Sequence, residues 1–413
     1  MVALQFLVLP VLVRIQVRQQ PTNTETLTLR AFLFVSMKNL SCIFLTVLLF
    51  GGVVIAADRL PQREETLKTL IRVNDKYLKN HPDPLQPIPY YSRKKVYDAN
   101  IWTRAVYFEG LMALHSIYPD NRLLDYATDW AEGFHWGMKG DVTTTRNADN
   151  YCCAQTYIDL YRLCPEPKRL TKTKGTMNML VNTPQTGDWT WIDAIQMGMP
   201  ILAKMTSETG DRRYADKARK MYVTTRDSIG GGLFNSKEGL WWRDADFVPP
   251  YKSPNGTNCY WSRGNGWVLA ALVRVLDEAQ PDDPWRSAYE NDLKQMCEAL
   301  RKCQREDGFW NVNLLDESDY GGKELTGTAL FVYGMAWGVR NGLLDRRTYL
   351  PVIAKAWNAM VNETVRPDGT LGYVQGTGKQ PSDGQPVTFD SKPDFDDYGT
   401  GCFLLAGTEV YKL

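Results

Sequence analysis

The chain has 413 residues, of which 44% are hydrophobic and 23% charged, and its net charge is +1. This composition is typical of a globular protein that is long enough to bury a large core. The near-zero charge and the lack of a basic run argue against partners such as nucleic acid or an acidic membrane surface.

The N-terminal part holds a stretch that resembles a targeting segment. A cation precedes an apolar run over 43–55, and the small residues Ala56 and Ala57 follow it, as in a secretory signal peptide. The run is too short to favour a spanning helix. We therefore expect a signal peptide at 37–57 within an upstream part at 1–57, and a periplasmic or secreted protein without stable membrane insertion after cleavage. An uncleaved N-terminal anchor is the alternative.

The cysteines and histidines offer little for a metal centre. Eight cysteines occur, and one of them, Cys42, falls in the predicted signal, so an odd number remains. That number does not suggest a disulfide framework in a chain of this length, although one or two bridges are compatible with it. With only three histidines and no Cys-x-x-Cys, we expect neither a metal ion nor a cofactor.

Beyond the signal, apolar residues recur with helical spacing. Twelve such segments in short-linked pairs are typical of a repeat architecture of six helical hairpins, an (α/α)6 toroid or barrel. An irregular helical bundle is the alternative. No linker divides the chain, so we expect one domain over 58–413. The predicted helices are 67–78, 100–117, 121–137, 149–163, 168–181 (the weakest), 190–208, 212–227, 263–279, 285–304, 325–341, 346–363 and 397–412.

Aspartates mark three of the junctions, and two long segments are not helical. Asp120, Asp211 and Asp345 stand where N-caps are expected. Glycines and prolines prevent a regular helix over 230–262, and 365–395 is similar. Long loops in a compact domain tend to be functional, so we expect these two to border a cleft.

Two carboxylates are the candidate acid and base. Asp193 follows Trp191 in the first turn of the predicted helix 190–208, and Asp149 begins the predicted helix 149–163. A lone Asp at such a place is usually a cap, and the helix dipole lowers its pKa. Burial beside rings or a second carboxylate would raise the pKa instead. If both helices are inner helices of one toroid, the two carboxylates face one pocket.

Rings and guanidinium groups surround these candidates in the sequence. Trp261 and Trp267 flank Arg263, and Gly264 and Gly266 let the backbone approach a ligand. The preceding loop adds further rings and a second guanidinium, in Trp242 and Arg243. Flat rings stack on sugar faces, and arginine binds carboxylates with two parallel hydrogen bonds. The set predicts a pocket for an acidic sugar, whereas packing at a helix start is the alternative.

These motifs resemble those of glycoside hydrolase families 88 and 105, the unsaturated glucuronyl and rhamnogalacturonyl hydrolases, and are closest to the second. The similarity runs from about residue 60 to 413. It is carried by Asp149-Asn150, the Thr156 to Tyr161 stretch, Trp191-Ile192-Asp193, Tyr260 to Leu272, Gly327 to Phe331 and Asp397 to Gly401.

The resemblance implies an (α/α)6 barrel that acts without a metal on oligosaccharides left by polysaccharide lyases. Asp193 would be the general acid/base and Asp149 the second carboxylate, and they would hydrate the C4=C5 bond of a terminal unsaturated uronate. Trp191, Trp261, Arg263 and Trp267 fall where the families line the sugar pocket.

One position departs from the pattern. Members often carry a histidine in the pocket loop, and Arg243 stands at the nearest place here. This departure leaves the exact uronic substrate open. We expect a hydrolase of pectin- or rhamnogalacturonan-type fragments. A catalytically inactive glycan-binding protein on the same barrel is the alternative, and an epimerase is disfavoured because the histidines are few.

Overall fold

The computed structural model of the protein describes residues 3–8, 11–16, 59–90, 94–140, 145–391 and 397–413. The chain forms two compact units, and the boundary between them lies between residues 56 and 57. In the first, strands β1 (Ala3–Val8) and β2 (Val11–Gln16) pair antiparallel, with Ala3 opposite Gln16. The predicted signal over 37–57 lies outside the described residues.

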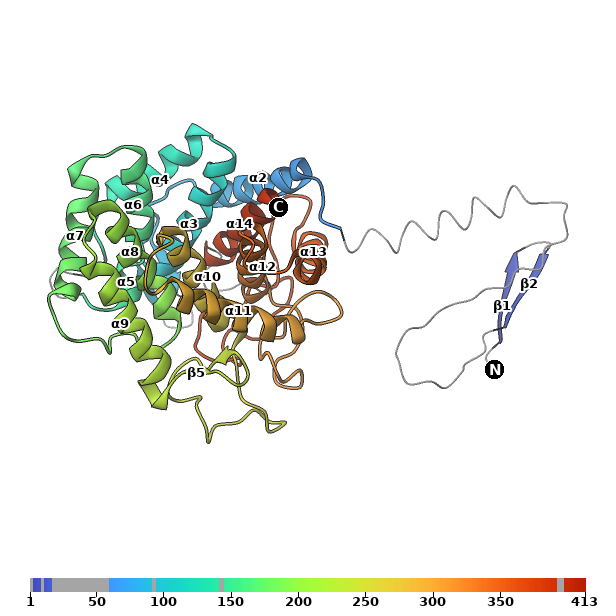
Figure 1. Ribbon diagram of the computed structural model, residues 1–413. Helices are drawn as coiled ribbons and strands as arrows, with labels where there is room; N and C mark the ends of the chain where they lie inside the picture. The colour runs from blue at the N-terminus through green and yellow to red at the C-terminus, as the bar shows by residue number, and fades with distance from the viewer. Residues whose placement is uncertain (1–2, 9–10, 17–58, 91–93, 141–144, 392–396) are drawn as a thin grey trace. The chain divides into compact units, whose positions relative to one another are not determined.

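The second unit is a ring of helices (Figure 1). Its inner helices are almost wholly buried, and each packs on the next in the order α3, α14, α12, α10, α8, α6 and back to α3, so that the ring closes. The inner helices are α3 (Trp102–Ile117), α6 (Ala154–Leu163), α8 (Asp193–Thr209), α10 (Ser262–Glu278), α12 (Leu325–Arg340) and α14 (Asp397–Lys412).

A second set of helices alternates with these along the chain and packs outside them. Their buried residues recur every three or four positions, as the sequence pattern predicts for helices with one face in water. The outer helices are α2 (Arg63–Asn80), α4 (Asn121–Gly133), α7 (Pro167–Val181), α9 (Arg213–Asp227), α11 (Arg286–Lys302) and α13 (Arg346–Thr364). The predicted (α/α)6 toroid is confirmed.

Two predicted helices differ in detail. The helix expected over 121–137 ends at Gly133, because His135 and Trp136 take left-handed backbone angles, with φ of 51° and 56°. The helix expected over 149–163 is divided into α5 (Ala148–Tyr151) and α6 by a tight turn at Cys152 and Cys153.

No α-helix occurs over 230–261 or over 365–391, the described parts of the two segments that were expected to be non-helical, except that α10 begins at Ser262. The first contains a short 3-10 turn, η2 (Ile229–Gly231), and the hairpin of β5 (Phe234–Asn235) and β6 (Leu240–Trp241). Another hairpin, β3 (Ile88–Tyr90) with β4 (Lys95–Tyr97), precedes α3. Each of these loops leads into the start of an inner helix, so the loops gather at one end of the barrel.

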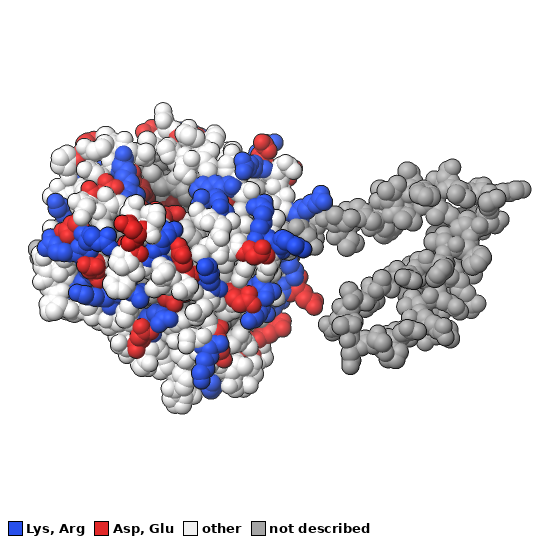
Figure 2. Space-filling view, in the orientation of Figure 1, with Lys and Arg blue, Asp and Glu red and all other residues white. Residues whose placement is uncertain are grey.

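Figure 2 shows basic and acidic side chains interspersed over the face in view, in keeping with the small net charge. Among the described helices, none combines the length and the apolar character that crossing a bilayer requires.

Two of the three N-caps expected from the sequence are formed, at Asp120 and Asp345, whereas the N-cap of α9 is Arg212 rather than Asp211; one further cap lies in the core. Asp120 and Asp345 accept backbone hydrogen bonds at the starts of α4 and α13, and Asp211 accepts one from Arg213. Glu324 caps α12 from a fully buried position, where its carboxylate accepts from the backbone N–H of Thr326 and of Gly327 at 2.8 and 2.7 Å.

Replacing this buried cap should therefore cost more than replacing an exposed one. Glu324→Ala is expected to lower the free energy of unfolding by about 2–4 kcal/mol, because buried N–H groups lose their partners. Asp345→Ala, at an exposed cap, should cost about 1 kcal/mol. Urea unfolding of both variants measures the difference, and equal losses would contradict the role given to Glu324.

Candidate active site

A cavity of about 520 Å³ lies at the end of the barrel where the inner helices begin. Residues at or near the starts of α3, α5, α8 and α10 line it, together with parts of the β3–β4 hairpin and of the loop before α14. The lining residues are Tyr90, Tyr97, Ile101, Trp102, Thr103, Asp149, Trp191, Asp193, Met197, Arg243, Trp261, Arg263, Thr377, Gly378, Lys379, Gln380 and Asp383.

Both predicted carboxylates line this cavity, and neither side chain caps its helix. At α5 the cap is Asn147, whose side-chain oxygen accepts the backbone N–H of Asp149 at 2.9 Å. At α8 the residue before Asp193 is Ile192, which has no capping side chain. The alternative that these aspartates are ordinary caps is thereby removed, and both carboxylates are left for the cavity.

Burial and mutual repulsion shape the acidity of the pair. Burial, together with the charge of Asp193, raises the pKa of Asp149 to about 7. Burial likewise raises the pKa of Asp193, which is 8% exposed, although Arg243 and Arg263 act in the opposite direction. Near neutral pH the pair can therefore hold one proton, which is what an acid/base site requires.

Arg243 holds Asp193 in place. Its Nε donates to Asp193 Oδ2 at 3.0 Å, and its Nη1 donates to Asp244 Oδ2 at 2.6 Å. The backbone joins the same segments, because the N–H of Ile192 donates to the carbonyl of Arg243 at 3.0 Å. Among the described residues Nη2 of Arg243 has no hydrogen-bond partner, so this edge of the guanidinium is available to a ligand.

Arg263 also lines the cavity, but its guanidinium is engaged by the protein. Nη1 and Nη2 donate to the carbonyls of Gln375 and Gly376, each at 2.8 Å, and the group lies over the Trp261 ring at 4.5 Å. Arg263 thus fastens the loop that carries Thr377 and Lys379 to the barrel, and it adds positive charge beside Asp193.

The four predicted tryptophans separate into two groups. Trp191 and Trp261 line the cavity, and Trp261 Nε1 donates to Gln375 Oε1 at 2.9 Å. Trp242 and Trp267 are not among the lining residues. Trp242 packs against Tyr260, and Trp267 meets the edge of Trp102 with ring centroids 6.2 Å apart. Trp267 therefore supports a ring of the wall.

Other lining residues escaped prediction. Tyr90, Tyr97 and Trp102 add rings on the α3 side, and the Tyr90 hydroxyl is hydrogen bonded to Thr377. Lys379 adds a cation at the rim. The long loop over 365–395 had been expected to border a cleft. No motif in the sequence, however, singles out Tyr90, Tyr97, Trp102 or Lys379 as lining residues. Met197 of α8 also borders the cavity.

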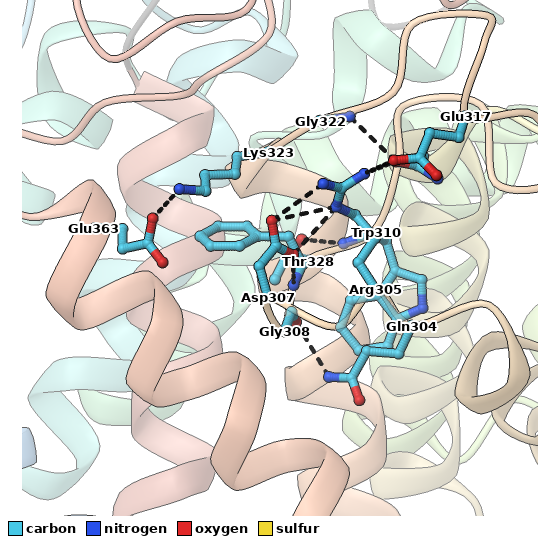
Figure 3. Close-up of polar contacts among 12 residues, drawn as sticks. Gln304, Arg305, Asp307, Gly308, Trp310, Glu317, Gly322, Lys323, Thr328 and Glu363 are labelled. Carbon is cyan, nitrogen blue, oxygen red and sulfur yellow. Dashed lines mark hydrogen bonds and ion pairs between the residues drawn. The ribbon is translucent and has the colours of Figure 1, made fainter. Parts of the chain in front are cut away.

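The loop between α11 and α12 supports the Trp261 segment from outside. Trp261 and Asn313 form an antiparallel bridge, and the N–H of Ser262 donates to the carbonyl of Val312 at 2.8 Å. Figure 3 shows the polar network around Arg305, near the start of this loop, which pairs with Asp307 at 3.1 Å and with Glu317 at 3.0 Å. The start of α10 is thus braced by a charged network.

The thiols show no bridge. The seven cysteines from Cys152 to Cys402 are all unpaired in the described part of the chain. Within the same residues no cluster of three or more histidine, cysteine or carboxylate side chains is arranged to hold a metal ion.

Comparison with known proteins identifies the family. The sequence profile of Glycosyl Hydrolase Family 88 matches residues 70–413. The chain belongs to this family. A protein of Formosa agariphila, named unsaturated 3S-rhamnoglycuronyl hydrolase, is 32% identical over 76% of this chain and 84% of its own. A protein of an Alteromonas species with the same name is 30% identical over 79% and 81%.

A solved structure agrees with the fold. A glycosyl hydrolase family 88 protein from Bacteroides vulgatus superposes with a TM-score of 0.76 at 32% identity, over 86% of this chain and 100% of that one. The resemblance found in the motifs is confirmed at the level of the family, which is one of the two that the motifs indicated.

The raised pKa of Asp149 has a consequence for stability. A carboxyl whose pKa is higher in the folded than in the unfolded state weakens folding as pH rises from about 4 toward about 7. Asp149→Asn should therefore raise the melting temperature at pH 8, and the gain should vanish near pH 4, where the wild-type carboxyl is protonated. Calorimetry at both pH values checks this. A gain that does not depend on pH would contradict the burial of an ionisable Asp149.

Proposed function

We propose that this protein removes a 4,5-unsaturated uronate from the non-reducing end of oligosaccharides left by polysaccharide lyases. The observation that carries the proposal is the pair Asp149 and Asp193, two carboxyls in one ring-lined cavity with a proton held near neutral pH. Membership of family 88 and the names of the two relatives support the same reaction.

The reaction is a hydration followed by ring opening. The C4=C5 bond of the substrate is an enol ether, so a proton delivered to C4 leaves an oxocarbenium-like centre at C5. Water adds at C5 and loses a proton to a carboxylate. The resulting hemiketal opens to a ketone at C5 and a hemiacetal at C1, and the hemiacetal releases the neighbouring sugar. No step needs a redox partner.

The two carboxyls divide the proton transfers between them. Arg243 and Arg263 favour the ionised form of Asp193, whereas Asp149 holds a proton to about pH 7. The protonated member of the pair donates its proton to C4, and the ionised member accepts a proton from the attacking water. The resemblance assigns the general acid/base role to Asp193. A proton shared with Asp149 is compatible with that role, because two coupled carboxyls titrate as a unit.

Arg243 is the candidate receptor for the uronate carboxylate. Its Nη2 edge is available, whereas both Nη atoms of Arg263 donate to backbone carbonyls. A carboxylate bound there would lie beside Asp193, which places C5 and C4 of the same sugar near the acid/base pair. Trp191 and Trp261 supply flat walls for the ring.

We further propose rhamnose as the neighbouring sugar, because both relatives carry the name 3S-rhamnoglycuronyl hydrolase. Fragments of rhamnogalacturonan type also contain rhamnose. The substrate expected from the sequence motifs and the substrate suggested by the relatives' names can therefore be compared in one assay. The assay follows the loss of ultraviolet absorbance of the conjugated double bond, with lyase fragments of ulvan, rhamnogalacturonan and glucuronan type.

The acid/base assignment predicts that Asp193→Asn abolishes turnover while the protein stays folded. The loss should be about 10²–10⁴-fold or more, since general acid–base catalysis contributes this much. An unchanged rate in this variant would refute the assignment. Binding of every fragment by the wild-type protein without any absorbance loss would instead favour the glycan-binding alternative.

The carboxylate receptor predicts two effects of Arg243→Gln. Loss of a hydrogen bond between charged groups should lower kcat/KM by about 10–100-fold. Because Arg243 lowers the pKa of both Asp149 and Asp193, both limbs of the pH–rate profile should also move to higher pH. Arg213→Gln, at an exposed ion pair with Asp211, is the matched control and should change neither. A profile that keeps its wild-type limbs would exclude contact with Asp193 in solution.

We also propose that the protein acts outside the cytoplasm. The support is the sequence pattern over 37–57 alone, in which a cation, a short apolar run and two alanines follow one another.

A further inference from the structure

Two tyrosine rings are exposed on the loops that precede α10 and α12. Tyr251 and Tyr320 are each 41% exposed and are among the few large apolar side chains in water in the described part of the chain. Single exposed apolar residues are common, but adjacent ones often mark a binding surface. Both loops lead into the starts of inner helices, which is the end of the barrel that holds the cavity.

The two loops are joined by hydrogen bonds. Ser253 and Asn313 are hydrogen bonded at 2.6 Å, and the N–H of Asn255 donates to Asp316 Oδ2 at 3.1 Å. Burial and the neighbouring Cys259, Asp319 and Tyr320 raise the pKa of the Tyr251 phenol.

The backbone at Tyr320 is held in an unfavourable conformation. Its φ is 63°, in the left-handed region that residues with a side chain rarely adopt. Contacts on both sides fix this turn: Arg305 pairs with Glu317, and the N–H of Gly322 donates to Asn311 Oδ1 at 3.1 Å (Figure 3). Strain that the surroundings maintain is frequent at functional sites. Here it keeps an aromatic ring in water.

A chain of contacts connects Tyr251 with the rim of the cavity. Lys379, which lines the cavity, pairs with Asp246 at 2.8 Å. The next residue, Phe247, meets Tyr251 edge to face with ring centroids 5.1 Å apart. An oligosaccharide whose unsaturated end lies at Asp193 occupies the cavity at this end of the barrel, where the loops that carry the two rings also lie.

We propose that Tyr251 and Tyr320 form an outer sugar-binding platform for the residues of longer substrates beyond the bond that is cleaved. The rings stack on the apolar faces of neutral sugars such as a deoxyhexose. This inference rests on the proposed function, and it assigns to the protein a preference for longer chains that the cavity alone does not provide.

The test compares chain lengths. Wild type, Tyr251→Ala and Tyr320→Ala are assayed with unsaturated disaccharide and tetrasaccharide from a lyase digest of a rhamnose–glucuronate polymer. Covering roughly 50 Å² of apolar surface at about 25 cal/mol per Å² predicts a loss of about five- to tenfold in kcat/KM for the tetrasaccharide. The disaccharide rate should not change. Tyr251→Phe and Tyr320→Phe keep the rings and should match wild type. Leu163→Ala, at an exposed residue of α6, is the matched control.

Binding separates this proposal from the proposed function. Calorimetric titration of tetrasaccharide into the Asp193→Asn variant, with and without Tyr251→Ala, should show the same five- to tenfold weakening at about 25 cal/mol per Å². Absence of turnover by the wild type would contradict the proposed hydrolase function and would not bear on the platform. Equal behaviour of wild type and both alanine variants toward the tetrasaccharide, or equal losses on both chain lengths, would overturn the platform.

Discussion

Two carboxyl groups facing one cavity resist being ionised together. Burial and the charge of Asp193 raise the pKa of Asp149 to about 7, and burial also raises the pKa of Asp193, against the opposing charge of Arg243. The pair can therefore offer a proton and a base at the same pH, which a hydration needs.

The barrel brings them together because its inner helices all begin at one end. Asp149 and Asp193 come from the first turns of α5 and α8, while Arg263 comes from that of α10. The loops before other inner helices support this end of the barrel, among them the loop before α14, which lines the cavity, and the loop before α12. Arg263 fastens one of them through the carbonyls of Gln375 and Gly376, and the network around Arg305 braces another. Positive charge near the carboxyls is thus used for structure as well as for chemistry.

Much of this arrangement could be predicted from the sequence. Helical periodicity located the helices and hence the toroid, and Trp-x-Asp at a helix start identified Asp193. The partners of each group could not be predicted, because they depend on loops that meet only in the folded chain. Arg263 was expected to bind substrate, yet backbone carbonyls more than a hundred residues away occupy its Nη atoms. Tyr90 and Tyr97 come from a short hairpin without a distinctive pattern.

The shared proton is the claim on which the mechanism depends, and infrared difference spectroscopy measures it directly. Titration of wild type minus Asp149→Asn should reveal the carbonyl band of a protonated carboxyl that disappears with a midpoint at about pH 7. A difference spectrum in which this carboxyl is already ionised in mildly acidic solution would contradict the account.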